Sequence, residues 1–71
     1  MNGYQELANA IILQAVKDYR QVLRILYMNP DDRKSQKEKT EIEQYFRSPL
    51  FAVSTKLDPE LLMKQLQAEV H

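Results

Sequence analysis

The sequence predicts a small all-α domain in which three shorter helices pack on one long N-terminal helix. Three observations lead to this prediction. Apolar residues recur with the period of an α-helix in the N-terminal part of the chain. Each of the three prolines follows a residue that commonly caps a helix. No stretch alternates apolar and polar residues as a half-buried strand does. The 71 residues suffice for a single domain, 1–71.

The first helix is expected over about residues 4–28. Its apolar residues form an arc that covers about half of the helix circumference. The arc consists of Tyr4, Leu7, Ala8, Ile11, Ile12, Ala15, Val16, Tyr19, Val22, Leu23, Ile25 and Leu26. It is wider than one neighbouring helix covers, so we expect either two helices of the same chain or a second copy of the chain against it. Asn29-Pro30 ends the helix, because a residue before proline avoids the helical region.

The second helix is expected over about residues 30–47. Asn29 would cap it, and Asp31 and Asp32 suit the positive end of its dipole. A start at Thr40 stays open, because the residues that follow match a capping box. The apolar residues of this segment are Ile42, Tyr45 and Phe46. Since all three lie near its C-terminal end, we expect the first half to project into solvent or to fray.

The third and fourth helices are expected over about residues 49–55 and 59–70. Each begins at a proline that follows a capping residue, Ser48 in one case and Asp58 in the other. The third helix is a short apolar segment. The inward residues of the fourth helix are predicted to be Leu61, Leu62, Leu66 and Val70.

The composition argues against catalytic and cofactor chemistry. The chain has no cysteine and therefore no thiolate metal site, and its one histidine is His71. No serine or threonine has a histidine to activate it, and there is no glycine-rich phosphate loop. We expect no enzymatic activity, no cofactor and no metal site.

The same composition bears on location and partners. No stretch approaches the ~20 apolar residues of a spanning helix, and the N-terminus lacks the basic region of a signal peptide. We therefore expect a cytoplasmic protein without membrane association. Ten basic and ten acidic residues give a net charge of zero. Because a dedicated nucleic-acid binder usually carries a large positive excess, nucleic acid is not the favoured partner.

A basic stripe on the first helix is the candidate binding surface. Lys17, Arg20 and Arg24 have helical spacing and share a face, with Leu13 one turn before Lys17. This face is expected to lie opposite the core. A charged stripe is usually a solvated face, but arginine beside an exposed apolar residue is a common combination at protein interfaces.

The basic residues of the second helix would extend this surface if that helix folds back beside the first. They are Arg33, Lys34 and Lys37. The combined surface would contact an acidic protein partner or nucleic-acid phosphates. Residues 47–67 also have the outline of a helix-turn-helix. That interpretation is disfavoured, because the presumed recognition helix opens with Asp58 and Glu60 rather than with side chains that contact bases.

Five residues are expected to have structural roles. Asp18 lies at the edge of the apolar arc, and a partly buried carboxylate needs a partner. Arg47 is one candidate, and the free N–H groups at the start of the third helix are the other. Tyr19, Phe46 and Phe51 fall on apolar faces and are expected to pack in the core.

Three segments resemble a group of short, mostly uncharacterised proteins encoded by phages, prophages and conjugative elements of Firmicutes. The pattern of that group is Ile-x-x-Gln-Ala-Val-x-Asp-Tyr-Arg, then Glu-Ile-Glu-x-Phe-Phe-x-Ser, then a leucine-rich last helix. The first part is matched by Ile11, Gln14, Ala15, Val16, Asp18, Tyr19 and Arg20. The second part is matched by Glu41, Ile42, Glu43, Phe46 and Ser48, and the third, loosely, by Leu57, Asp58, Glu60 and Leu62. Tyr45 replaces a Phe, and Leu50 stands where the group often has Trp.

The resemblance implies an accessory protein of a mobile genetic element, a class that includes inhibitors of host defence such as anti-CRISPR proteins. It carries no established activity, so no catalytic residues transfer. We expect a non-enzymatic protein that binds a macromolecule, chiefly by protein–protein contact, with a host protein as one candidate partner. Three alternatives stay open: an anti-CRISPR-like inhibitor that docks on a nuclease, a small DNA- or RNA-binding regulator, and a homodimeric structural module.

Overall fold

The computed structural model describes residues 3–70, with side chains from residue 8 onward. It confirms the predicted fold class. Within the described residues there is no strand, and the helices are α1 (Gly3–Met28), α2 (Arg33–Phe46), α3 (Pro49–Ser54) and α4 (Pro59–Ala68). His71 and the side chains of Tyr4 and Leu7, which entered the predictions above, lie outside the described part.

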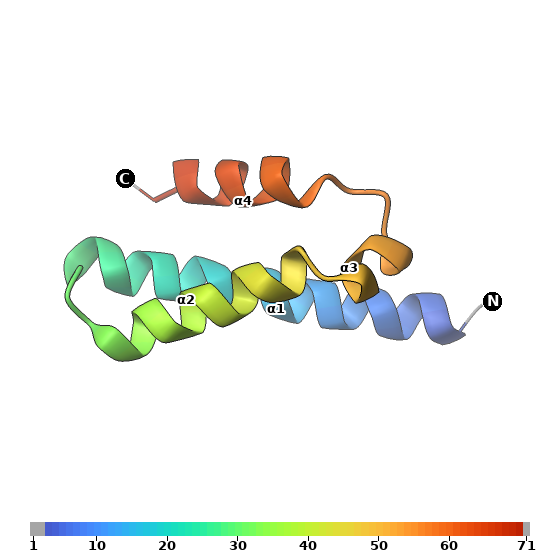
Figure 1. The fold of residues 1–71 in the computed structure, drawn as a ribbon, viewed down its shortest axis with the longest axis horizontal. Coiled ribbons are helices and arrows are strands. Elements are labelled where there is room, and N and C mark those ends of the chain that lie inside the picture. Colours follow the sequence, from blue (N-terminus) through green and yellow to red (C-terminus); the bar gives the residue numbers. More distant parts are fainter. Residues whose placement is uncertain (1–2, 71) are drawn as a thin grey trace.

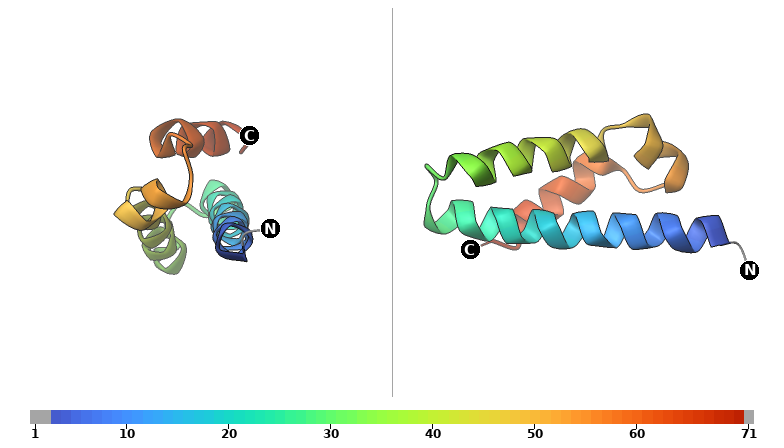
Figure 2. Two further views of the ribbon diagram at one scale, coloured as in Figure 1. Left: turned by 90° about the vertical axis from the view of Figure 1, so that its right-hand side faces the viewer. Right: turned by 90° about the horizontal axis from the view of Figure 1, so that it is seen from below.

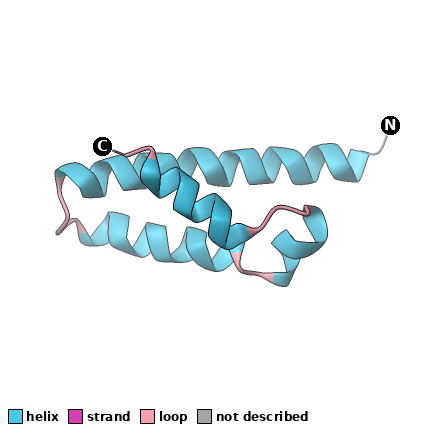
Figure 3. Ribbon diagram, turned by 90° about the horizontal axis from the view of Figure 1, so that it is seen from above, coloured by secondary structure: helices cyan, strands magenta, loops and turns pink. Residues whose placement is uncertain are grey.

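The helices form an antiparallel hairpin that a third helix covers on one face. α2 runs back alongside α1, and α3 turns the chain at the end of this hairpin (Figure 1). α4 then crosses over the hairpin toward the C-terminal end of α1 (Figure 3). Viewed end-on, α4 lies over the α1–α2 pair, and the opposite face of the pair carries no helix of the described chain (Figure 2).

The expectation that the first half of α2 projects into solvent is wrong. α2 packs along α1, and Ser35 in its first turn is only 3% exposed. Glu38 and Lys39 are half-buried on the inward side of the helix. The apolar pattern missed this packing, because a small serine and the aliphatic stems of charged side chains can fill inward positions.

The start of α2 also differs from the prediction. Asn29 does not cap it: the Asn29 N–H donates to the Ile25 carbonyl at 2.7 Å and so ends α1. Asp32 is the residue before the helix, and its carboxylate accepts from the Ser35 hydroxyl at 2.5 Å. Thr40 lies inside the helix, where its hydroxyl donates to the Gln36 carbonyl, so a start at Thr40 is excluded.

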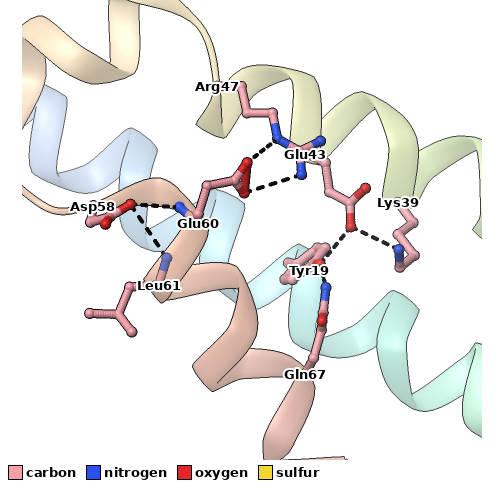
Figure 4. Close-up of polar contacts among 8 residues, drawn as sticks. All are labelled: Tyr19, Lys39, Glu43, Arg47, Asp58, Glu60, Leu61 and Gln67. Carbon is pink, nitrogen blue, oxygen red and sulfur yellow. Dashed lines mark hydrogen bonds and ion pairs between the residues drawn. The ribbon is translucent and has the colours of Figure 1, made fainter.

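The starts of α3 and α4 are confirmed. Ser48 Oγ accepts from the Phe51 N–H at 3.3 Å. Asp58 Oδ1 accepts from the Glu60 and Leu61 N–H groups at 3.0 and 3.5 Å (Figure 4). In both helices proline occupies the first turn, where a missing N–H costs nothing.

The predicted inward face of α4 is wrong at one position. Leu66 is buried and Leu62 and Val70 are half-buried, but Leu61 is 54% exposed. Met63 takes the inward place. Residues two positions apart in a helix point about 200° away from each other. Leu61 therefore faces solvent when Met63 faces α1.

The core is an aromatic cluster at the meeting point of the helices. Tyr19, Phe46 and Phe51 are fully buried. Their rings meet edge to face, with centroids 5.6 Å apart for Tyr19–Phe46 and 5.4 Å apart for Phe46–Phe51, a geometry that aromatic pairs favour. The remaining buried apolar residues are Ile12, Val22, Leu23, Met63 and Leu66.

The cluster predicts a large cost for removing one ring. Truncating a buried Phe costs about 3–5 kcal/mol, and small domains are stabilised by only ~0.05–0.15 kcal/mol per residue. Phe46→Ala should therefore lose a large share of the free energy of unfolding and unfold at a much lower urea concentration than wild type, as measured by far-UV circular dichroism. Leu50→Ala is the control, because Leu50 is 61% exposed. Cooperative unfolding of both variants near the wild-type midpoint would contradict the assignment of Phe46 to the core.

Candidate functional site

A polar cluster at Tyr19 joins three helices (Figure 4). The Tyr19 hydroxyl donates to Glu43 Oε2 at 2.7 Å and accepts from Gln67 Nε2 at 2.8 Å. Lys39 Nζ lies 2.8 Å from the same oxygen of Glu43. Among the described residues, no buried side-chain nitrogen or oxygen lacks a hydrogen-bond partner. The cluster therefore serves to hold α1, α2 and α4 together.

The two acidic groups of this cluster are poorly suited to proton transfer near neutral pH. Burial, opposed by the hydrogen bond from Gln67 and reinforced by the one to Glu43, raises the pKa of Tyr19 to about 12. Burial alone would also raise the pKa of Glu43, but hydrogen bonds from Lys39 and Tyr19 hold it below its usual value. General acid–base catalysis works best with a pKa near the operating pH, whereas the pKa of Tyr19 is raised and that of Glu43 is lowered, in each case away from neutrality.

The structure divides the predicted basic stripe of α1. Leu13 is 63% exposed, and Lys17 and Arg24 are exposed with it. Arg20 instead lies beside α4, where its Nε and Nη2 donate to the Glu69 carboxylate at 2.9 and 3.2 Å. The hydrogen bond from Arg20 and the charge of Arg24 lower the pKa of Glu69. The expectation that the stripe lies wholly opposite the core is therefore wrong, because α4 runs along one edge of it.

The basic residues of α2 do not extend this stripe, although α2 does fold back beside α1. Arg33, Lys34 and Lys37 are all exposed. α2 lies against the side of α1 that carries Val22 and Ile25, whereas the stripe projects from another side of the same helix. The two sets of cations therefore belong to separate surfaces.

The predicted partnership of Asp18 and Arg47 is wrong. Asp18 is exposed and accepts a hydrogen bond from Gln14 Nε2 at 3.0 Å. Arg47 donates through Nε and Nη2 to the Glu60 carboxylate at 2.8 and 3.2 Å and so connects the end of α2 to the first turn of α4 (Figure 4). At the start of α3, Ser48 already accepts from the Phe51 N–H. Asp18 is thus a surface residue of α1.

A groove between α1 and α2 is the feature that sequence reasoning missed. None of its lining residues comes from α4, and the face of the α1–α2 pair opposite α4 carries no described helix (Figure 2). Two hollows of about 290 and 280 Å³ adjoin there and share Asp18 and Ile42. The lining residues from α1 are Ile11, Gln14, Ala15, Asp18, Gln21, Val22 and Ile25, and those from α2 are Glu38, Glu41, Ile42 and Tyr45. We call this feature the α1–α2 groove.

The groove combines an apolar floor with acidic sides. Ile11 is 47% and Ile25 is 37% exposed, so both isoleucines are accessible where α1 meets the groove. The charged residues among those that line it are Asp18, Glu38 and Glu41, and all are acidic. The width of the apolar arc in the sequence was the available indication: both α2 and α4 pack against the arc, and part of it still remains open.

The described residues offer no metal centre and no membrane span. No group of three or more acidic or histidine side chains within them is placed to hold a metal ion. None of their helices is both long enough and apolar enough to cross a lipid bilayer.

Comparison with known proteins identifies no relative. No protein-family model, curated protein or solved structure matches the chain. The resemblance to proteins of phages and conjugative elements therefore stays a prediction from the sequence.

The Tyr19 cluster predicts a specific dependence of stability on pH. The Tyr19 phenol ionises near pH 10 in the unfolded chain and near pH 12 in the folded protein. Its raised pKa therefore contributes stability that is complete below about pH 10 and is lost as pH rises toward 12. Tyr19→Phe lacks this contribution and removes the hydroxyl that bonds Gln67 and Glu43, although Glu43 keeps Lys39; we expect a cost of about 1–3 kcal/mol at neutral pH.

The measurement is urea unfolding of wild type and Tyr19→Phe at neutral pH and at about pH 11. The difference between their free energies of unfolding should shrink at the higher pH, by up to the roughly 1.4 kcal/mol that one unit of pKa shift represents. The comparison cancels the other tyrosines and lysines, which both proteins share. A difference that stays constant with pH would show that Tyr19 ionises equally easily in the folded and unfolded states.

Proposed function

We propose that this chain is a non-enzymatic binding protein that acts by protein–protein contact, as an accessory protein of a mobile genetic element. The α1–α2 groove is the observation that carries the proposal. Single exposed apolar residues are ordinary on protein surfaces, but a groove that leaves several apolar residues accessible on a small domain is typical of a contact site. The part that concerns a mobile element rests on the resemblance in the sequence.

The charge distribution favours a protein over a nucleic acid as the partner. Binding to phosphates needs a contiguous positive surface. Here Arg20 and Arg47 are engaged by Glu69 and Glu60, and the other cations of α1 and α2 lie on separate surfaces. The groove itself carries carboxylates, which repel phosphate. A protein partner can use both the apolar floor and the acidic sides.

Affinity capture with matched variants tests the proposal. The immobilised protein is exposed to a lysate of a Firmicutes host, with and without nuclease. Wild type should retain a host protein at a fixed ratio in both conditions. Ile11→Gln/Ile25→Gln should retain at least about tenfold less, because two apolar contacts of roughly 1 kcal/mol each are lost. Leu13→Gln is the control, since Leu13 lies on α1 outside the groove.

Thermal unfolding of each variant shows first that the helices are intact. Capture that disappears with nuclease would replace the proposal by nucleic-acid binding. A wild type that retains no protein would contradict it, as would equal losses in the groove variant and the Leu13→Gln control.

A further inference from the structure

We propose that the α1–α2 groove binds a cationic amphipathic helix of a partner protein. This inference rests on the proposed function and specifies the chemistry of the partner. It follows from the charges of the groove, from its length and helical walls, and from the face of the fold on which it lies.

The groove concentrates negative charge in a chain with no net charge. Asp18 from α1 and Glu38 and Glu41 from α2 line it, and no cation does. Lys34 and Lys37 precede the two glutamates by one helical turn, but neither forms an ion pair with them in the described part of the chain. The local excess of negative charge is therefore available to a ligand.

The carboxylates of the groove differ from those elsewhere in the fold. Glu43, Glu60 and Glu69 each bind a cation of this chain, with N–O distances of 2.8, 2.8 and 2.9 Å. Within the described residues, the side chains of Glu38 and Glu41 have no hydrogen-bond or ion-pair partner, and Asp18 accepts only from a glutamine. Acidic groups beside an apolar floor attract lysine or arginine, and charge complementarity of this kind selects the partner and its orientation.

The shape of the groove fits a helix. From Ile11 to Ile25 it follows α1 for ~21 Å, which is about four helical turns. A guest helix with apolar residues on one face would place them on the isoleucines and flank them with cations. An extended peptide usually binds by pairing with the edge of a β-sheet, and the described residues form no strand. The backbone groups of such a peptide would therefore lack hydrogen-bond partners in the groove.

Among the described helices, one face of the α1–α2 hairpin is left uncovered and has room for such a helix (Figure 2). α4 covers one face of the α1–α2 hairpin, and no described helix covers the other (Figure 2). The residues that line the groove come from α1 and α2 and include none of α4. A guest in the groove would lie across the hairpin from α4. The α1–α2 hairpin would then be covered by α4 on one face and by the guest helix on the other.

A second copy of the chain fits the groove less well. A symmetric dimer places the same surface of both copies face to face. The carboxylates of Asp18, Glu38 and Glu41 would then oppose their own counterparts, and like charges across an interface are costly. Self-association through the groove is therefore an outcome that would overturn the inference.

The test uses three labelled designed peptides that share one apolar helical face. Their flanking positions carry lysine, glutamate or glutamine. Fluorescence anisotropy measures their affinity for the whole chain. We expect the lysine peptide to bind about tenfold more tightly than the glutamate peptide at low salt, and the preference to fall as salt is added.

Single charge reversals provide matched variants. Glu41→Lys changes a carboxylate of the groove, and Asp31→Lys makes the same change at an exposed carboxylate in the α1–α2 turn, outside the groove. Glu41→Lys should lower the affinity for the lysine peptide at least about fivefold, and Asp31→Lys should leave it nearly unchanged. The reason is that a charge close to the peptide contributes far more than a distant, screened one. Ile11→Gln and Leu13→Gln form the corresponding apolar pair.

The outcomes separate this inference from the proposed function. Equal binding of all three peptides, no binding of any, or equal effects of Glu41→Lys and Asp31→Lys would each overturn the cationic helix. The inference would also be overturned if the wild-type chain sediments as a dimer and the Ile25→Gln variant sediments as a monomer. None of these results alters the affinity-capture test. A host protein that wild type retains and Ile11→Gln/Ile25→Gln does not would still support protein binding, by a partner of different chemistry.

Discussion

The fold depends on the contacts of one side chain, Tyr19. Its ring is fully buried against Phe46, and its hydroxyl bonds Glu43 from α2 and Gln67 from α4. A buried hydroxyl without partners would be costly, and here residues of α2 and α4 both bond the same oxygen atom. A shift of α2 or α4 by one turn along α1 would break one of these bonds. A single residue therefore sets the register of three helices.

This constraint also determines which surface stays open. Gln67 and the Glu69–Arg20 pair hold α4 over one side of α1, while α2 occupies another. The apolar arc of α1 is too wide for these two neighbours, so Ile11 and Ile25 remain accessible at the α1–α2 groove. The candidate binding surface is thus the remainder of the same apolar pattern that builds the core.

Local features of the sequence predicted the fold, whereas contacts between residues far apart in the sequence were not predicted. The period of the first helix and the caps at Ser48 and Asp58 act within a few residues, so they could be recognised along the chain. The partner of Arg47 depends on where α4 begins in space, and the burial of Ser35 depends on how α2 lies on α1. The groove was not predicted for the same reason, because its acidic residues come from two helices whose relative rotation no local pattern specifies.

The attachment of α4 has a consequence for the order in which the molecule opens. α4 is held by Met63, Leu66 and Gln67 and by an exposed ion pair near each end, Arg47–Glu60 and Arg20–Glu69. Exposed ion pairs contribute little to stability and weaken with salt. The contact between α4 and α1 is also less extensive than the contact between α1 and α2. Backbone amides of α4 should therefore exchange with solvent through a local opening of lower free energy than global unfolding, and the α1–α2 hairpin is the unit that persists longest.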